Sequence, residues 1–518
     1  MTDDPTATAD DKAPSDTPPR LPRWAPVTII ILSAVVVVLL ALLGTSIMER
    51  RWESARPVLV AADLDPFESD NAVWGGNYPL EYDGYTRQED STTRTRFGGA
   101  YLRDYLADPP EGNPNLVMMF AGYGFAEDYL QARGHIHAVD DIKGNKDKGI
   151  KGTARVKPGK FAGTCWTCKS TDVPRMMGAF GKQVAPKETD PITLISLGAE
   201  RFYASNFHDL TPEMTHPIGC LDCHDPKTMA LRISRPALRE AYKVVTGKKI
   251  ETASHQEMRS LVCAQCHSEY YFKGPGKYLT FPWMKGPKIA AGTSAEKMIE
   301  YCDANGVTDW VHPISKTKII KAQHPDYEMY ATGVHAYRNV SCSDCHMPYR
   351  SAGGMKVTDH HIQSPLLNIS NSCAVCHRWS EAEITTRVEA IQTKVANGRL
   401  DAERAIIRAH FDVAAAMQAD VPDADLARVR KLIRHAQFRW DYVAANNGMG
   451  FHSPQESMRL LGLAMNQAQQ ARILVARLLG AKGITAEPKY PDFSTRALAM
   501  ALVEAFVKPD INDPKLLP

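Results

Sequence analysis

Ten of the eleven cysteines in this 518-residue chain form five pairs in which two residues separate the partners. A histidine follows the second cysteine in four pairs, and a lysine follows it in the first pair. In a C-x-x-C-H segment the two thiols form thioether bonds to one haem, and the histidine then lies beneath the iron as an axial ligand. The spacing therefore predicts five covalently bound c-type haems. The motifs are Cys165-x-x-Cys168-Lys169, Cys220-x-x-Cys223-His224, Cys263-x-x-Cys266-His267, Cys342-x-x-Cys345-His346 and Cys373-x-x-Cys376-His377.

Two other kinds of site use paired cysteines. Zinc ribbons contain C-x-x-C units, but they do not require an imidazole directly after each pair. A disulfide within such a pair closes only a very small loop and stabilises a fold little. The repeated histidine favours haem over both alternatives. The remaining thiol, Cys302, is expected to be a small buried hydrophobe and not a ligand.

The N-terminal region predicts a membrane anchor. Residues 1–26 are rich in Pro, Asp and Thr and are expected to form a flexible cytoplasmic tail. Residues 27–48 contain no charge, and a helix of about that length crosses a hydrocarbon layer of roughly 30 Å. A cleavable signal peptide is the alternative, although its apolar region is usually about 7–15 residues long. Because covalent haem attachment takes place outside the cytoplasm, the chain from Glu49 onward is expected on the extracytoplasmic face of the cell membrane.

Charge and composition exclude some functions and leave the class of fold open. The 61 Lys and Arg residues nearly balance the 59 Asp and Glu residues, so the net charge of +2 gives no support to nucleic-acid binding. A hydrophobic content of 44% is ordinary for a globular protein. The fold class therefore has to come from the motifs and from periodicity.

The motifs predict a mainly α, multihaem cytochrome c fold with little β structure. Haems attached between residues 165 and 377 leave little protein between them, so residues 49–378 are expected to form a compact five-haem core. Residues 379–518 are predicted to form long helices. Ser380 and Glu383 read as a capping box, and Asn397-Gly398 is expected to end that first helix. An apolar stripe predicts a second helix, and Pro454 begins a third that runs to about Gly480. The stripe consists of Leu426, Val429, Ile433, Ala436, Trp440 and Val443.

Lys169 is the exception among the residues that follow the cysteine pairs. A lysine amine binds iron only when it is deprotonated, as metal coordination requires. The alternative is a degenerate motif in which Lys169 is solvated and another residue binds. A haem with an unusual donor on one face and an open second face binds and reduces small ligands, whereas a bis-His haem only passes electrons.

Five motifs in this order, with C-x-x-C-K first, resemble those of the pentahaem, ammonia-forming cytochrome c nitrite reductases. The similarity extends from about Arg133 to the C-terminal helices. It implies that the Lys169 haem is catalytic and that an arginine, a tyrosine and a histidine line its open face. The segment 268–272 resembles the family segment that places Tyr270 in this pocket. The segment 321–325 similarly implies His324 as the pocket histidine, and the segment 152–156 implies Arg155 as the pocket arginine.

The same resemblance implies a calcium site and the second axial ligands of four haems. Calcium would be held by Glu269, the Tyr270 carbonyl, Lys321 and Gln323, which are the oxygen donors that a hard cation prefers. The implied distal ligands of the haems attached at 263–266, 373–376, 220–223 and 342–345 are, in that order, His135, His335, His360 and His452. His137 and His361 are adjacent alternatives. The other histidines are expected to be hydrogen-bonded in the interior or exposed, and they are His208, His216, His255, His312, His410 and His435.

The function implied by the resemblance is the six-electron reduction of nitrite to ammonia, with hydroxylamine and sulfite as further substrates. The family also implies a membrane-bound multihaem quinol dehydrogenase as electron donor and a homodimer built on the C-terminal helices. One alternative is a membrane-anchored electron-transfer cytochrome without substrate chemistry. Another, a hydroxylamine-oxidising multihaem protein, is disfavoured by the number of motifs and by Lys169.

Overall fold

The computed structural model describes residues 22, 24–54, 60–90, 92–100, 113–125, 133–145, 147, 150, 152, 161–285, 291–352 and 355–507. The chain divides into two compact units, residues 1–59 and residues 60–518. Almost all of the predicted N-terminal tail lies outside the described residues.

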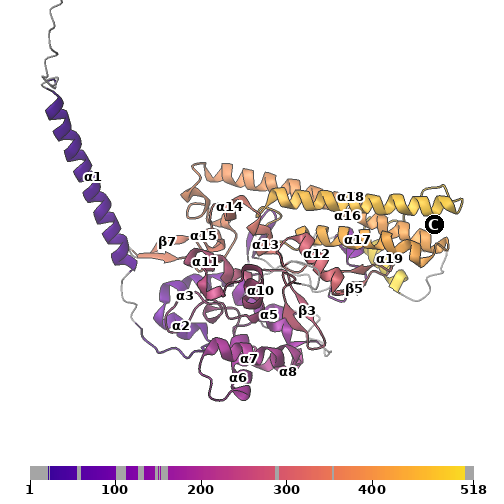
Figure 1. Ribbon diagram of the computed structural model, residues 1–518, viewed down its shortest axis with the longest axis horizontal. Helices are drawn as coiled ribbons and strands as arrows, with labels where there is room; N and C mark the ends of the chain where they lie inside the picture. The colour runs from indigo at the N-terminus through magenta and orange to yellow at the C-terminus, as the bar shows by residue number, and fades with distance from the viewer. Residues whose placement is uncertain are drawn as a thin grey trace, which may run out of the picture. The chain divides into compact units, whose positions relative to one another are not determined.

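In the first unit the charge-free run forms one long helix, α1 (Ala25–Ser54) (Figure 1). Its segment Ala25–Glu49 is long and apolar enough to cross a membrane, and its most apolar 18-residue window has no buried residue. A membrane anchor and a signal sequence near the N-terminus both meet this description. The structure thus agrees with an apolar N-terminal helix and leaves the choice between these roles open.

The second unit is mainly helical, as predicted, and its first part consists of short elements. Short helices suit a core in which loops and turns must bring cysteine pairs to a shared cavity. Up to the fifth motif the α-helices are α2 (Asn71–Asn77), α3 (Pro79–Thr86), α4 (Pro114–Met119), α5 (Ala138–Lys143), α6 (Asp172–Val184), α7 (Pro191–Ala204), α8 (Phe207–Leu210), α9 (Cys220–Cys223), α10 (Pro236–Thr246), α11 (His255–Ala264), α12 (Ala295–Ala304), α13 (Asp326–Ala331), α14 (Val334–Tyr337) and α15 (Cys342–His346).

The β structure in the described part of the chain is limited to four two-stranded antiparallel sheets. The second sheet begins at Tyr271, directly after the third cysteine motif, and so fixes the course of the chain beside that motif. The pairs are β1 (Thr93–Thr95) with β2 (Gly98–Ala100), β3 (Tyr271–Lys273) with β4 (Tyr278–Thr280), β5 (Trp310–Val311) with β6 (Lys318–Ile319), and β7 (Tyr349–Ala352) with β8 (Met355–Thr358).

Four helices form the C-terminal part: α16 (Glu381–Gln418), α17 (Asp423–Ala444), α18 (Pro454–Ala481) and α19 (Arg496–Val507). The long helices α16, α17 and α18 pack against one another (Figure 1). The predicted capping box is present, since the Glu383 N–H donates to Ser380 Oγ at 3.3 Å and the Ser380 N–H donates to the Glu383 carboxylate at 2.9 Å. The predicted apolar stripe of α17 is buried along its whole length. The predicted start of α18 at Pro454 is confirmed.

The prediction that the first of these helices ends at Asn397-Gly398 is wrong, because α16 continues to Gln418. A Cβ at Gly398 would lie 3.1 Å from Met458 Cε and 3.4 Å from Leu461 Cδ1. Both neighbours belong to α18, so this glycine permits close packing of two helices. The Asn-Gly pair therefore marks a helix contact and not a helix end.

Two buried histidines outside the motifs stack on each other in the core. The ring centroids of His312 and His410 are 3.7 Å apart with 14° between the ring planes. His312 Nε2 bonds the Met118 carbonyl at 2.9 Å, and His410 bonds Ser315 Oγ at 2.7 Å and Gln437 Oε1 at 2.9 Å. Burial lowers the pKa of His410 to about 4, and burial together with the facing His410 lowers that of His312 well below its ordinary value. Both residues are hydrogen-bonded interior histidines, as expected.

This pair predicts that the free energy of unfolding falls as the pH is lowered from 6.5 to about 4. In the unfolded chain His410 takes up its proton near pH 6.5, whereas in the folded chain it does so near pH 4. The unfolded state binds more protons in that window, so stability is complete above it and is reduced by about 3 kcal/mol at its lower end. Denaturant unfolding of wild type and His410→Gln, followed by circular dichroism at several pH values, measures this slope. An identical slope in the variant would contradict the prediction.

Candidate active site

All five cysteine motifs line a single cavity of about 2940 Å³ in the described part of the chain. This volume is about three times the upper end of the range for a pocket that binds one small molecule. The ten cysteines, the residue that follows each pair and the four expected distal histidines all belong to its wall. The cavity therefore has the size and the donors for several large prosthetic groups.

Three of the expected axial pairs face each other across this cavity at nearly equal separations. A metal that binds two imidazole nitrogens at about 2.0 Å each holds the ring centroids roughly 6 Å apart, so these pairs fit an iron between them. The alternative ligand His137 instead bonds the Glu89 carbonyl through Nε2 at 3.2 Å. The centroid distances are 6.2 Å for His224 and His360, 6.3 Å for His335 and His377, and 6.2 Å for His346 and His452.

Four of the predicted axial histidines use the ring nitrogen Nδ1 in a hydrogen bond to an oxygen acceptor. Donation from Nδ1 fixes the tautomer in which Nε2 carries the lone pair, and metal-binding imidazoles are usually held in this way. No sequence motif marks the acceptors. They are Met229 O for His224 at 2.8 Å, Gln363 O for His346 at 2.9 Å, Thr358 O for His360 at 2.9 Å, and Asp326 Oδ2 for His267 at 2.9 Å.

The third motif lies at the centre of the five. Its Cys266 is in hydrogen-bond contact with Cys168 of the first motif, and its Cys263 is in contact with Cys342 of the fourth. Cys266 also interacts electrostatically with Cys223 of the second motif, as Cys345 does with Cys373. The first, third, fourth and fifth motifs are therefore neighbours in that order. The second motif lies next to the third.

His324 and Tyr270 both lie in the cavity wall. Tyr270 directly precedes β3, and its ring centroid is 6.3 Å from that of His324, which lies just before α13. Burial, together with the positive charges of Lys169 and His267, lowers the pKa of His324 to about 3. Lys169 and His324 are thus close enough to interact, and His324 is a neutral imidazole at pH 7. Of the three residues predicted for the pocket, Tyr270 and His324 lie side by side and Lys169 lies within electrostatic range of His324.

Glu269, one of the calcium ligands implied by the sequence, lies close to a second buried carboxyl group, that of Glu328. Glu269 Oε2 accepts the Gln323 N–H at 2.6 Å, and the Glu269 N–H donates to Glu328 Oε1 at 2.8 Å. Glu328 Oε2 is buried without a hydrogen-bond partner. Burial raises the pKa of Glu328 to about 8 and that of Glu269 well above its ordinary value. Two buried carboxyl groups without a cationic hydrogen-bond partner suit a hard divalent cation.

Glu328 lies at this site, but none of the segments that resemble the family had indicated it. The side chain of Lys321 points elsewhere, because its ammonium group pairs with Asp441 Oδ1 at 2.8 Å. Only its carbonyl is then available as a donor. Among the described residues no group of three or more His, Cys, Asp or Glu side chains is arranged to hold a metal ion, which is consistent with a site that relies on carbonyl and amide oxygens. Arg155, the expected pocket arginine, lies outside the described residues.

Comparison with known proteins decides the family. Residues 70–516 match the family model described as Cytochrome c552. The chain belongs to the cytochrome c552 family. The cytochrome c-552 of Porphyromonas gingivalis is 43% identical over 490 residues, which cover 93% of this chain and 92% of that protein. The cytochrome c-552 of Bacteroides fragilis is 44% identical over 469 residues, which cover 90% of this chain and 89% of that protein.

A solved structure resembles this chain over most of its length. It is the cytochrome c nitrite reductase of Desulfovibrio desulfuricans, whose catalytic subunit has two calcium sites. The TM-score is 0.70 at 27% identity, and the match covers 88% of this chain and 95% of that one. The resemblance inferred from the motifs, the mainly helical multihaem cytochrome c fold and the oxidoreductase class are confirmed.

Proposed function

We propose that this protein reduces nitrite to ammonium with six electrons and eight protons at the haem attached to Cys165 and Cys168. The balance is NO₂⁻ + 8 H⁺ + 6 e⁻ giving NH₄⁺ + 2 H₂O. The observation that carries the proposal is the electrostatic proximity of Lys169 and His324, together with Tyr270, in a wall where three other motifs pair histidine with histidine. When bound, the Lys169 haem supplies the iron that binds and reduces the anion, and the four bis-His haems store and deliver electrons.

The protein groups around the open face have separate roles in this reaction. Lys169 would hold the haem iron through its neutral amine. His324 is a neutral imidazole, so its ring N–H donates a hydrogen bond to a nitrite oxygen as negative charge develops there. Tyr270 offers a phenol group for positioning and proton transfer, and Arg155 offers a guanidinium group for the anion. Hydroxylamine and sulfite carry similar small polar groups and are proposed as further substrates.

We also propose a bound calcium ion held by Glu269, the Tyr270 and Lys321 carbonyls and Gln323. The buried carboxyl groups of Glu269 and Glu328 support this, as do the calcium sites of the Desulfovibrio desulfuricans protein. A divalent charge beside Tyr270 would raise the local potential and favour the binding of an anion.

We predict that removal of this ion lowers both the stability of the enzyme and its affinity for nitrite. We expect that treatment with a calcium chelator lowers the thermal midpoint and raises the KM for nitrite, because two buried carboxylates are left without a counter-charge. Glu269→Gln should lose bound calcium in elemental analysis. Glu300→Gln, on an exposed turn of α12, serves as the control and should retain it. Equal calcium content in the two variants would exclude the proposed ligand set.

Three further properties belong to the same proposal. We propose that α1 is an uncleaved anchor with residues 1–26 in the cytoplasm, that the core at 49–378 faces outward, and that a membrane-bound multihaem quinol dehydrogenase supplies the electrons.

We propose a homodimer through the helices of residues 379–518. On α18 the side chains of Met458 and Ile473 are 40% and 53% exposed, which supports contact with a second copy. Membrane fractionation with N-terminal peptide mapping, and light scattering of the solubilised protein, test these assignments.

Spectroscopy of the purified protein separates this function from simple electron transfer. A haem count by the pyridine haemochrome method should give five haems per chain. Addition of nitrite or cyanide should change the electron paramagnetic resonance (EPR) and visible spectra of one haem and leave four low-spin haems unaltered. If all five haems are low-spin and none responds to either ligand, the protein is an electron-transfer cytochrome instead.

A further inference from the structure

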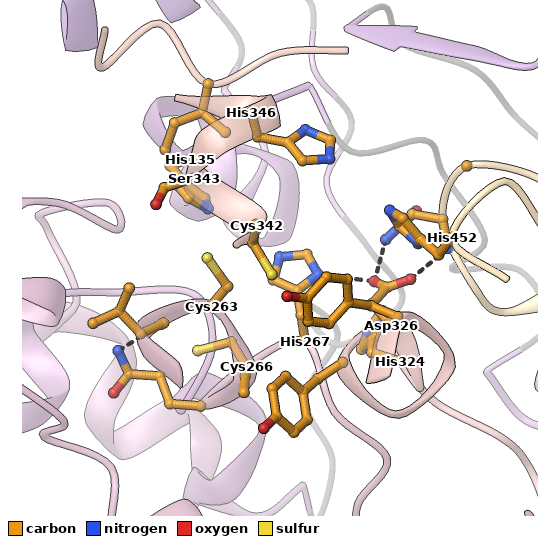
Figure 2. Close-up of a pocket in the computed structure, with 18 of the residues that line it drawn as sticks. His135, Cys263, Cys266, His267, His324, Asp326, Cys342, Ser343, His346 and His452 are labelled. Atoms are coloured by element: carbon orange, nitrogen blue, oxygen red, sulfur yellow. Dashed lines mark hydrogen bonds and ion pairs between the residues drawn. The ribbon is translucent and has the colours of Figure 1, made fainter. Parts of the chain in front are cut away.

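His267 differs from the other motif histidines in the group that accepts its ring N–H. The acceptor is the side-chain carboxylate of Asp326, at 2.9 Å from Nδ1 (Figure 2). The corresponding rings of His224 and His346 donate to backbone carbonyls. Among the described motif histidines with a hydrogen bond at Nδ1, His267 alone donates to a charged acceptor. A carboxylate places more negative charge on the imidazole than a carbonyl does.

The loop between α17 and α18 bonds the Asp326 carboxylate through three N–H donors. Asn446 Nδ2 donates to Oδ1 at 2.8 Å, and the Asn447 backbone N–H donates to the same oxygen at 2.6 Å. Asn447 Nδ2 donates to Oδ2 at 2.7 Å, which is the oxygen that faces His267. The carboxylate is thus fixed in place beside the His267 ring.

This charge is located at the junction of the five attachment sites. Cys266 lies beside the first motif and Cys263 beside the fourth, so His267 belongs to the motif that joins the first and second motifs to the fourth. Asp326 is also two residues from His324, and its N–H donates to the His324 carbonyl at 2.7 Å. One short segment therefore carries both the pocket histidine and the acceptor at the junction.

We propose that Asp326 is a positioning residue that gives His267 anionic character and so lowers the reduction potential of the haem attached to Cys263 and Cys266. The inference rests on the haem attachment proposed above. A more negative axial donor stabilises ferric over ferrous iron, and hydrogen bonding to an axial ligand is a known control on potential. With a low potential at the junction, electrons pass through this haem and collect on its neighbours, including the Lys169 haem where six are consumed.

Two variants of the holoprotein with opposite expected effects test the proposal in a redox titration followed by EPR. Asp326→Asn removes the charge, so it should raise the midpoint potential of one bis-His haem and shift its g-values. Asn447→Ala removes the side-chain donor that competes for Oδ2, so it should lower the midpoint potential of the same haem. A loss of packing alone would not move one haem in opposite directions. The control is Asp359→Asn, a buried carboxyl beside His360 that bonds the His361 backbone N–H at 3.1 Å and should leave this haem unchanged.

The outcomes separate this inference from the proposed function. Unchanged potentials and g-values in Asp326→Asn would overturn the role of Asp326 while nitrite reduction stands. If Asp326→Asn loses a haem, Asn447→Ala decides, and the absence of a lowered potential there overturns the proposal. If peptide mass analysis finds no haem on Cys263 and Cys266 of the wild type, both the inference and the proposed haem arrangement fail.

Discussion

Replacement of Lys169 by histidine is expected to leave five haems attached and to reduce nitrite turnover by about 10²-fold or more. The thioether bonds come from Cys165 and Cys168, which the substitution does not touch, so haem content is preserved. The shorter imidazole changes both the donor and the position of the group beneath the iron, and the identity of the axial ligand governs whether a haem activates a bound molecule. The measurement is a steady-state assay with reduced methyl viologen beside a haem count.

The reciprocal substitution provides a matched control for Lys169→His. His224→Lys places a lysine at the second motif, whose partner His360 closes the other face. This variant should keep the nitrite-binding spectrum of one haem, since the pocket with His324 is unchanged. Full six-electron activity in Lys169→His would show that Lys169 is not the functional ligand.

Replacement of His324 by asparagine is expected to lower kcat/KM for nitrite by 10²- to 10⁴-fold, the range for loss of a positioned acid–base or hydrogen-bonding group. The ring is buried and lies beside Lys169 and Tyr270. The residue also precedes α13, so the backbone course is checked by circular dichroism and by the haem count. Tyr270→Phe should have a smaller effect, because the phenol is one of three polar groups at the pocket.

His216→Gln serves as the control for His324→Asn. His216 is partly exposed, bonds Asp172 and is not among the residues that line the cavity. Its substitution should leave kcat/KM within a factor of about two, as expected for surface changes away from special features. Near-normal kcat/KM in His324→Asn with intact haem content would remove His324 from the mechanism.

The parts of this structure that depend on local sequence were predictable. The C-x-x-C spacing defines its own attachment chemistry, and the capping box at Ser380 and the stripe along α17 follow from interactions within a few residues. Cys302 is buried in the core, as its chemistry suggested. The mainly helical fold also followed from the motifs and from the family that they resemble.

The parts that depend on long-range contacts were not predictable. The pair Asn397-Gly398 is typical of a helix end, yet Gly398 lies within α16 and allows α18 to approach it. This role depends on the position of α18, which the local sequence does not give. The hydrogen bond from His267 to Asp326 joins residues 59 positions apart, and the Glu328 carboxyl reaches Glu269 over the same separation. No spacing rule in a single sequence marks such partners.

The most direct test of the central claim is the stoichiometry of nitrite reduction by the purified holoprotein. ¹⁵N-labelled nitrite is supplied with reduced methyl viologen, and the nitrogen products and the electrons consumed are both quantified. The account predicts one ¹⁵N-ammonium and six electrons for each nitrite, without release of nitric oxide or hydroxylamine. Protein that carries all five haems and consumes no nitrite, or that releases nitric oxide as its main product, would contradict it.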